Sequence, residues 1–346
     1  MHGSKGRVSP RRHSAALQRR ILRLVRHRLA NVNDTQLCEL LRSEEQICLG
    51  RETLRRILRQ AGIPPKRKRR PSPYRRRRER KPAFGMMLQI DASPHDWIEG
   101  RGPWLTLVGA IDDATNFRWA RFVKAENTWA YLDLLHAVAS SQGLPLSLYS
   151  DRHSIFFSHR EPTIQEELRG IGPLTQFGRA MDELGIRIIP AYSPQAKGRV
   201  ERMWGVLQDR LVVELRLANA RTLDDANAVL ARFLVNHNAR FRVVPAQSTP
   251  VFRAAPSTSR LDRICCLKDL RTVSNDHTIS FEGLVLQIPP SKTFHSIAGR
   301  KVHVLQLRDG SIEIAYRDRC VARFSPSAVT RMVHAKPNIQ TDLKAA

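Results

Sequence analysis

The sequence predicts a multidomain protein with an N-terminal all-α region, a central α/β region built on a mixed sheet, and a C-terminal β region. Apolar residues near the start of the chain recur at three- and four-residue steps, the period of an amphipathic helix. Strand-like and helix-like runs alternate in the middle of the chain, and short alternating runs with turn residues follow them. The 346 residues, of which 42% are hydrophobic, are enough for two or three domains.

The chain is strongly basic. It has 58 Lys and Arg against 32 Asp and Glu, a formal net charge of +26, and residues 66–81 alone contain eleven Lys and Arg with one Glu. Such a balance favours a polyanionic partner, with nucleic acid first and an anionic membrane surface second. No run approaches the about 18 apolar residues of a membrane span, and the N-terminus lacks the apolar core of a signal peptide. We therefore expect a soluble cytoplasmic protein.

Residues 15–63 are expected to form a helix-turn-helix domain. One helix-like run starts at Ala15, a second can be capped by Asn33 or Asp34, and a third covers residues 51–61. The third carries arginines on its polar side, which fits a recognition helix that enters the DNA major groove. A basic helical bundle that only packs on the main domain is the alternative. The candidate DNA contacts on the third helix are Arg51, Thr53, Arg55 and Arg56.

Residues 64–84 are expected to form a basic linker. Their prolines and like charges prevent a packed core. A flexible cationic segment attracts DNA strongly, in a salt-sensitive and sequence-independent way. A solvated spacer is the alternative. The candidate DNA contacts in the linker are Lys66, Arg67, Lys68, Arg69, Arg70, Arg75, Arg76, Arg77 and Arg78.

Residues 85–240 carry the α/β pattern. The order of elements, β-β-β-α-β-α-β-α, matches the ribonuclease-H-like topology, which is a mixed five-stranded sheet with helices on both faces. Gly143 is expected to end the first helix of this region, because glycine commonly follows a helix C-terminus. The expected strands cover residues 86–90, 104–112, 117–124, 144–151 and 186–191, and the expected helices cover residues 128–139, 176–184, 200–215 and 223–236.

Three acids occupy distinctive places in this pattern. Asp91 and Asp151 each end a predicted strand, and Glu201 lies just inside a predicted helix, at the flank of its apolar stripe. Three carboxylates brought together can hold two divalent cations, and two metals about 3.5–4 Å apart can clamp a phosphodiester for in-line displacement. The cations around Glu201 suit a phosphate substrate. They supply further candidate DNA contacts at Lys197, Arg199 and Arg202, with Gln195 beside them.

Each of these acids also has a structural explanation when it is considered alone. Asp151 could cap a turn, and Glu201 could pair with a neighbouring cation. Asp112 and Asp113 are rivals for the first acid. We prefer Asp91, because it ends the first strand, whereas the other two precede a turn and suit hydrogen bonding there.

The C-terminal region is expected to form a small β-barrel over residues 263–326. The segment from Arg308 to Ser311 lies between two alternating runs and is a hairpin signal. Prolines mark residues 241–262 as a linker. The ends of the chain, residues 1–14 and 327–346, are expected to be disordered tails.

At Asp91, Asp151 and Glu201 the sequence resembles the DDE-type transposases of bacterial insertion sequences, which have a retroviral-integrase-like catalytic core. The segment SPQAKGRVER resembles the family pattern SPQ-x-x-G-x-x-E-R around the last acid, and LQID and LYSD resemble the strands that carry the first two. The 49 residues between Asp151 and Glu201 are more than the family commonly has, and the loop at residues 153–174 holds the excess. The front region is also short, so we expect full-length relatives to carry a further helical unit.

The resemblance implies a transposase that performs Mg²⁺-dependent DNA strand cleavage and strand transfer of an insertion sequence. Asp91 and Asp151 would bridge two Mg²⁺ ions and Glu201 would hold one of them, with Mn²⁺ able to substitute. The implied partners are double-stranded DNA, at the element ends and the target, and further copies of the chain in a synaptic multimer near the bacterial nucleoid. No membrane and no small-molecule substrate is implied.

Two other functions remain open on the sequence alone. The first is a non-catalytic DNA-binding regulator with an integrase-like fold. The second is a structure-specific nuclease of the same fold, such as a ribonuclease H or a junction resolvase.

Overall fold

The chain forms two compact units. The first contains the described parts of Met1–Glu79 together with Pro94–Leu105 and Glu201–His237, and the second contains the rest. None of the helices in the described ranges is both long enough and apolar enough to cross a membrane. The computed structural model describes residues 13–67, 79–168, 172–191, 198–290 and 294–334.

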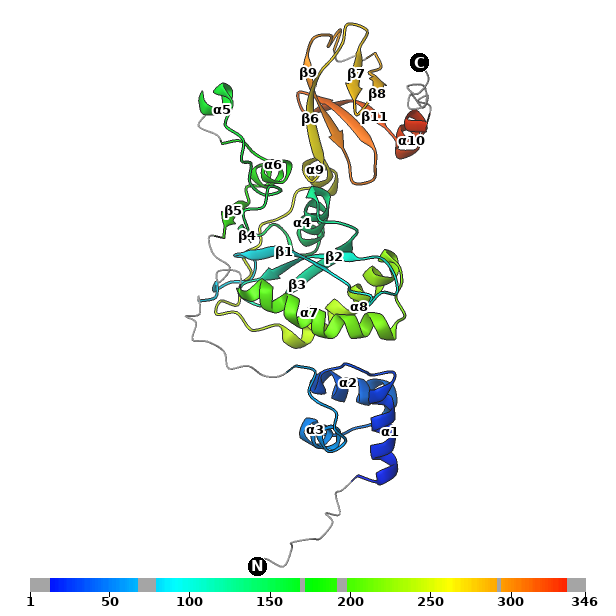
Figure 1. Ribbon diagram of the computed structural model, residues 1–346. Helices are drawn as coiled ribbons and strands as arrows, with labels where there is room; N and C mark the ends of the chain where they lie inside the picture. The colour runs from blue at the N-terminus through cyan, green and yellow to red at the C-terminus, as the bar shows by residue number, and fades with distance from the viewer. Residues whose placement is uncertain (1–12, 68–78, 169–171, 192–197, 291–293, 335–346) are drawn as a thin grey trace, which may run out of the picture. The chain divides into compact units, whose positions relative to one another are not determined.

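The first unit begins with three helices, at the positions that the sequence predicts. The side chain of Ser14 caps the first by accepting a hydrogen bond from the N–H of Leu17 at 3.2 Å. Asn33 caps the second by accepting from the N–H groups of Thr35 and Gln36. Such caps satisfy N–H groups that the first turn of a helix leaves without partners. The helices are α1 (Ala15–Arg26), α2 (Asp34–Glu45) and α3 (Arg51–Gln60), coloured blue in Figure 1.

Helix α7 (Gly198–Leu217) contributes to the apolar core of this N-terminal region. Val213 of α7 is fully buried, as are Ile21, Leu37 and Leu54 from the three N-terminal helices. The core is therefore shared between segments more than 150 residues apart in the sequence, which hydrophobic periodicity alone does not reveal. The long helix α8 (Leu223–Phe241) follows α7 in the chain.

A half-buried carboxyl group, that of Glu214, lies beside this shared core. Gln36 of α2 is 1% exposed, and its side-chain amide donates to the Arg210 carbonyl at 3.0 Å and to Glu214 Oε1 at 3.1 Å. Burial raises the pKa of the Glu214 carboxyl above its usual range, with the charges of Glu44 and Glu39 adding to the shift and Gln36 and Arg210 opposing it. The folded protein therefore binds this proton more tightly than the unfolded chain does.

The variant Glu214→Gln is expected to raise the melting temperature at neutral pH. Above the ordinary glutamate pKa of 4.5, the unfolded chain loses its proton while the folded state still resists ionisation, so this residue lowers stability as the pH rises. Glutamine keeps the oxygen that accepts from Gln36 and has no proton to lose. Thermal unfolding between pH 4 and pH 8 should show the gain growing with pH. A gain that does not depend on pH, or a loss at pH 8, would contradict this reasoning.

The second unit is built on a mixed five-stranded sheet with the strand order β3-β2-β1-β4-β5. Strands β2 and β3 pair antiparallel, whereas β4 pairs parallel with both β1 and β5. This sheet and its order confirm the mixed α/β fold predicted for the centre of the chain, with the topology of a ribonuclease-H-like core. The strands are β1 (Leu88–His95), β2 (Leu105–Asp112), β3 (Arg118–Val123), β4 (Ser147–Ser150) and β5 (Arg187–Pro190).

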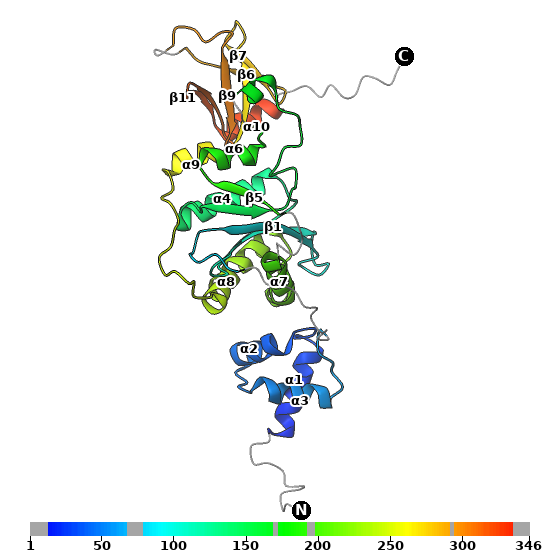
Figure 2. The ribbon, with the colours of Figure 1, turned by 90° about the vertical axis from the view of Figure 1, so that its left-hand side faces the viewer.

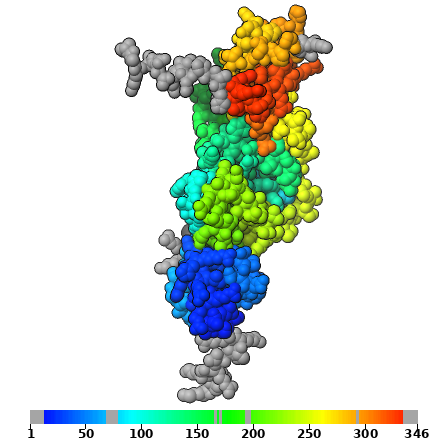
Figure 3. Space-filling view, turned by 90° about the vertical axis from the view of Figure 1, so that its right-hand side faces the viewer, coloured from blue at the N-terminus to red at the C-terminus, as the bar shows by residue number. Residues whose placement is uncertain are grey.

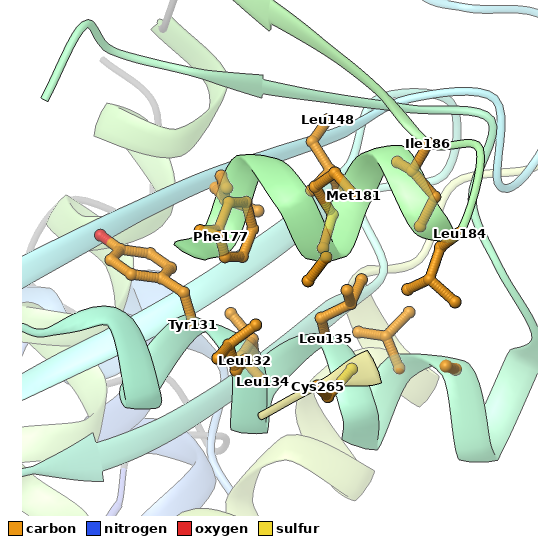
Figure 4. Close-up of a cluster of buried hydrophobic side chains, with 14 of the residues drawn as sticks. Tyr131, Leu132, Leu134, Leu135, Leu148, Phe177, Met181, Leu184, Ile186 and Cys265 are labelled. Carbon is orange, nitrogen blue, oxygen red and sulfur yellow. The ribbon is translucent and has the colours of Figure 1, made fainter. Parts of the chain in front are cut away.

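Helices α4 (Thr128–Gln142) and α6 (Gln176–Glu183) cover one face of this sheet. Their side chains form a continuous apolar layer with β4, in which Leu135, Phe177 and Met181 meet Leu148 (Figure 4). Close packing of this kind fixes the position of the two helices on the sheet. The short helix α5 (Ile164–Leu168) belongs to the loop that precedes α6, and its apolar residues Ile164 and Leu168 are exposed.

Gly143 ends α4, as the sequence predicts. It adopts a positive φ of 101°, and a Cβ at this position would lie 2.4 Å from the Arg253 carbonyl. The close approach allows Leu144 to pair with Arg253 through two backbone hydrogen bonds. Residues 241–262, predicted as a linker, are therefore attached to the core, and they include part of helix α9 (Thr258–Ile264).

The C-terminal region forms two sheets around one apolar core. A four-stranded sheet has the order β11-β10-β9-β6, and β7 and β8 form a separate two-stranded sheet. The predicted hairpin is confirmed, because β9 and β10 pair antiparallel and Asp309 accepts from the N–H and Oγ of Ser311 in the turn between them. The elements are β6 (Leu267–Thr272), β7 (Thr278–Phe281), β8 (Leu284–Gln287), β9 (Lys301–Gln306), β10 (Ile312–Tyr316), β11 (Arg319–Phe324) and α10 (Pro326–His334).

The closed barrel predicted for residues 263–326 is not confirmed. Among the described residues, the β7–β8 pair makes no ladder with the four-stranded sheet, and it shares a core with it through side chains such as Phe281, Leu286 and Val304. Short strands that meet face to face leave the sheet edges unjoined, whereas a barrel closes them by hydrogen bonding. Helix α10, within the predicted tail, packs on this core through Val329 and Met332 and forms the red patch in Figure 3.

Polar side chains join the C-terminal region to the core of the second unit. Arg308, in the β9–β10 turn, donates to Asp133 Oδ1 at 2.7 Å and to Nδ1 of His136 at 3.0 Å, both on α4. Helices α6 and α9 lie side by side (Figure 2), and Arg179 of α6 donates to the carbonyls of Ile264 and Cys266. The C-terminal region is thus fixed to the core by specific contacts.

Candidate active site

Asp91 and Asp151 belong to neighbouring interior strands of the central sheet, Asp91 within β1 and Asp151 directly after β4. The parallel ladder pairs Leu88 with Leu148 and Gln89 with Tyr149. Two residues further along, the same register brings Asp91, within β1, next to Asp151, the residue directly after β4. Strand β1 continues to His95, so the prediction that Asp91 ends the first strand is wrong. Both aspartates are half-buried. The carboxyl ends of parallel strands are where open α/β sheets commonly carry their sites.

The loop after β4 is folded against its own aspartate. The N–H of His153 donates to Asp151 Oδ1 at 3.2 Å, and the N–H of Phe156 donates to the His153 carbonyl at 2.9 Å. Phe156 is buried, and its ring packs edge to face on Tyr131 of α4, with the ring centroids 4.7 Å apart. The aromatic contact anchors the segment that orients the Asp151 carboxylate.

The buried phenol of Tyr131, on α4, interacts electrostatically with both aspartates. Its hydroxyl donates to Glu126 Oε1 at 2.5 Å, and its side chain is 2% exposed. Burial raises the pKa of the Tyr131 phenol far above its ordinary value, Glu126 raises it further, and the charges of Asp91 and Asp151 both add to the shift. The Tyr131 hydroxyl therefore stays protonated and acts as the hydrogen-bond donor to Glu126.

The first turn of α7 is attached to β1. Val200 is fully buried, and its N–H donates to Gln89 Oε1 at 3.3 Å. Gln89 lies two residues before Asp91 and is also fully buried. Glu201 is the next residue on α7, is exposed, and belongs to the first unit. Among the described residues, no three His, Cys, Asp or Glu side chains form a cluster that could hold a metal ion. The register of β1 and β4 places two of the predicted acids, Asp91 and Asp151, next to each other.

Asp112 and Asp113, the rival acids, are fully buried and enclosed by hydrogen bonds. Asp112 accepts from the N–H groups of Gly85 and Thr115 and from the Thr115 hydroxyl. Burial raises the pKa of the Asp112 carboxyl, although these hydrogen bonds oppose the shift. Asp113 accepts from the backbone N–H of Lys81 at 2.7 Å. The bonds match the turn role expected for these residues.

A buried network that the sequence does not reveal involves Asp113. Its Oδ1 accepts from Gln89 Nε2 at 2.8 Å and from the Arg199 guanidinium at 3.0 Å. Arg199, predicted as a DNA contact, thus ties the start of α7 to the turn after β2. The only signal in the sequence is a polar Gln89 in a strand of apolar residues, and it does not identify partners 24 and 110 residues away.

The variant Asp113→Ala is expected to lower the free energy of unfolding by about 3 kcal/mol. Removing one partner of a buried ion pair leaves the other charge without compensation, which typically costs about 3–5 kcal/mol. Urea-induced unfolding measures the effect. The variant Asp113→Asn keeps an acceptor for Lys81 and Gln89 and should lose less. A value for the alanine variant within about 0.5 kcal/mol of the parent, the usual range for surface changes, would show that the network is unimportant.

The predicted DNA contacts on α3 face solvent. Arg51, Arg55 and Arg56 are exposed and Thr53 is half-buried, while Leu54 and its apolar neighbours face the core. Glu52 lies 3.3 Å from Arg51 and from Arg55, but ion pairs at such exposed positions contribute little. The outward face of α3 thus presents three guanidinium groups.

The predicted contacts in the linker fall into two groups. Lys66 is held within the protein, because its ammonium lies 2.9 Å from Asp209 Oδ1 and donates to the Asp209 carbonyl. Arg67 is exposed. The remaining linker cations and two of the predicted contacts before Glu201 lie outside the described residues; they are Lys68, Arg69, Arg70, Arg75, Arg76, Arg77, Arg78, Gln195 and Lys197. Arg202, one residue after Glu201, is exposed.

The sequence has two bacterial relatives of known family. Over 318 residues, 91% of this chain, it is 35% identical to a putative transposase, y4bF, of Sinorhizobium fredii (strain NBRC 101917 / NGR234), and it covers 68% of that protein. Over 354 aligned positions, 92% of this chain, it is 31% identical to the transposase for insertion sequence IS1202 of Streptococcus pneumoniae, and it covers 74% of that protein. No protein-family model matches the sequence.

The chain belongs to the transposases of bacterial insertion sequences. It is therefore an enzyme of the polynucleotidyl transferase type.

Solved structures with some likeness to this chain come from retroviral integrases. The catalytic core of BIV integrase is 21% identical, with a TM-score of 0.33, over 45% of this chain and 85% of that one. A chain of the simian T-cell lymphotropic virus intasome, solved in complex with a PP2A regulatory subunit, is 16% identical with a TM-score of 0.40, over 88% of this chain and 99% of that one. Scores of this size do not define a fold.

Proposed function

We propose that this transposase cuts and joins DNA strands at a divalent-metal site formed by Asp91 and Asp151, with Glu201 as the third ligand. The observation that carries the proposal is the parallel register of β1 and β4, which brings Asp91, within β1, next to Asp151, directly after β4. Two neighbouring half-buried carboxylates repel each other, and a bound cation relieves that repulsion. Carboxylate oxygens are also the ligands that Mg²⁺ prefers, so the donor set fits the metal.

Two Mg²⁺ ions at this site, for which Mn²⁺ could substitute, would supply Lewis acidity to the attacking and leaving oxygens of an in-line phosphoryl transfer. Asp91 and Asp151 would hold the cations between them, and Glu201 would complete the set from the first turn of α7. Gln89 and the Val200 N–H orient the start of that helix by their hydrogen bond. His153 and Phe156 keep the loop after β4 folded on Asp151. The attacking groups would be water for cleavage and a DNA 3′-hydroxyl for joining.

The N-terminal helices would select the DNA. In a helix-turn-helix, the last helix places its side chains against base edges in the major groove. The exposed guanidinium groups of Arg51, Arg55 and Arg56 suit this role, and Thr53 lies on the same helix. The basic linker would contact the phosphate backbone, which adds affinity without sequence information. Because an element has two ends, the working form would be a multimer that holds both, on chromosomal DNA in the cytoplasm.

The direct test uses labelled DNA that carries the ends of the insertion sequence, a target plasmid and Mg²⁺. We expect strand cleavage at the element ends and end-joined products, which the variant Asp151→Asn should not give. Binding without cleavage would indicate the DNA-binding regulator instead. Cleavage at DNA structures without joining would indicate the structure-specific nuclease.

A further inference from the structure

Tyr131, near the start of α4, belongs to an aromatic cluster that supports the loop after Asp151. Its ring packs edge to face on Phe156, with the centroids 4.7 Å apart, and lies 6.1 Å from the ring of Phe177. Phe156 and Phe177 also pack on each other, at 5.3 Å. All three side chains are buried. A change in the position of the Tyr131 ring would therefore also displace the loop that contains Phe156.

This loop is connected to the Asp151 carboxylate through His153. The N–H of Phe156 donates to the His153 carbonyl at 2.9 Å, and the N–H of Ile155 donates to His153 Nδ1 at 3.3 Å. The N–H of His153 in turn donates to Asp151 Oδ1 at 3.2 Å. The aromatic cluster and the aspartate are thus joined by a short series of hydrogen bonds within one turn of chain.

The hydroxyl of Tyr131 connects the aromatic cluster to a further acid, Glu126. In Figure 4 this hydroxyl points away from the labelled apolar side chains, and it donates to Glu126 Oε1 at 2.5 Å. The tyrosine is 2% exposed, whereas Glu126 is exposed. A donor in the core therefore holds a carboxylate that a ligand can reach from solvent. The same phenol interacts electrostatically with Asp91 and Asp151, so the three acids share one neighbour.

A purely structural role is the alternative for Glu126. The residue precedes Asn127, which caps α4 by accepting from the N–H of Ala130 at 2.9 Å. An acid at a helix N-terminus contributes about 0.3–1 kcal/mol, and a buried tyrosine hydroxyl normally has a hydrogen-bond partner. Neither explanation requires that the tyrosine also support the loop that orients Asp151. Both predict that the loss of Glu126 affects stability and leaves metal binding unchanged.

We propose that Glu126, oriented by Tyr131, is an outer carboxylate of the divalent-metal site, which accepts hydrogen bonds from water on the cation instead of binding the cation directly. Mg²⁺ gives up its water reluctantly and usually keeps several water ligands in a protein site. Glu126 and Tyr131 are then positioning residues for strand cleavage. This inference rests on the proposed function and adds a further acid to Asp91 and Asp151, within the same compact unit.

The test is the variant Glu126→Gln in the full-length chain, which keeps an oxygen that can accept from Tyr131. We expect the Kd for Mn²⁺, followed by paramagnetic resonance without DNA, to rise about tenfold, within the 10–100-fold range typical of such outer partners. Cleavage of saturating element-end DNA should be slow when the metal is limiting and should recover in excess metal, because the two aspartates are intact. The Kd for the DNA should not change.

The variant Tyr131→Phe tests whether orientation matters as well as charge. It removes only the hydroxyl and keeps the ring that packs on Phe156. We expect Mn²⁺ binding to weaken about threefold to tenfold, the effect of one typical hydrogen bond. The double variant with Glu126→Gln should bind Mn²⁺ no more weakly than Glu126→Gln alone, because the two residues act through one contact.

The matched control removes the same charge from the C-terminal region. Glu282 is exposed in the turn between β7 and β8, and Glu282→Gln should leave both Mn²⁺ binding and cleavage unchanged. Circular dichroism and thermal unfolding should show that each variant keeps the parental fold, since none of them removes an apolar side chain from the core.

The outcomes separate this inference from the proposed function. The role of Glu126 is overturned if Glu126→Gln binds Mn²⁺ within twofold of the parent, or if excess metal does not restore cleavage. It is also overturned if Tyr131→Phe binds Mn²⁺ as the parent does, because charge alone would then explain the effect of Glu126. If Asp151→Asn binds Mn²⁺ and cleaves normally, the proposed metal site itself fails, whatever the Glu126 variants do.

Discussion

Replacing Asp91 or Asp151 by asparagine is expected to lower the rate of DNA strand cleavage by about a thousandfold. Metal-assisted stabilisation of a phosphoryl-transfer transition state is worth several kcal/mol, and each 1.36 kcal/mol is a factor of ten in rate. Asparagine has nearly the same size as aspartate but lacks its negative charge, so it should weaken cation binding without disturbing the sheet edge. The measurement is single-turnover cleavage of labelled element-end DNA in Mg²⁺.

The same variants should bind element-end DNA as the parent does, because neither aspartate lies in the N-terminal helices. Binding of Mn²⁺, followed by its paramagnetic resonance signal, supplies a readout apart from activity and should weaken in both variants. A variant that cleaves at the parental rate would remove its aspartate from the site. Loss of DNA binding together with cleavage would point to a damaged fold instead.

Replacing Arg51, Arg55 and Arg56 together by alanine is expected to abolish preference for the element ends. A good bidentate contact between arginine and a base is worth about 1–3 kcal/mol of discrimination, so three such contacts account for a loss of at least about a hundredfold in specific affinity. Leu54 and Leu58, which hold α3 in the core, are untouched. Fluorescence anisotropy with element-end DNA and with unrelated DNA of the same length gives the ratio of the two affinities.

The matched control removes the same charge from another exposed surface of the N-terminal region. Arg19, Arg23 and Arg26 are exposed on α1. Their replacement by alanine should weaken binding to both DNAs alike, because lost phosphate contacts reduce affinity without regard to sequence. Equal losses of end preference in the two triple variants would mean that α3 does not read the bases.

Much of the central fold follows from the local pattern of the sequence. Alternating and helical periods locate the strands and helices of the sheet region, Asn33 marks the start of α2, and Gly143 marks the end of α4. The placement of Asp91 beside Asp151 follows from the parallel pairing of β1 with β4, although β1 continues beyond Asp91 to His95. These features depend on residues within one element or on the order of elements.

The features that the sequence does not reveal depend on partners far apart in the chain. Arg199 and Lys66 are predicted DNA contacts, and the structure pairs them with Asp113 and Asp209, partners that the local sequence does not identify. The C-terminal strands are short enough to close a barrel or to form two sheets, and local periodicity is the same in both cases. The core shared by α2 and α7 requires knowledge of tertiary packing, which no local period contains.

The most direct measurement is the structure of the protein on cleaved element-end DNA in the presence of Mn²⁺, with the ions located by anomalous scattering. The proposed site predicts two ions about 3.5–4 Å apart, the spacing of known two-metal sites. Carboxylate oxygens of Asp91, Asp151 and Glu201 should bind them beside the DNA 3′-end. Ions held elsewhere, or a Glu201 carboxylate that takes no part in binding them, would contradict the account.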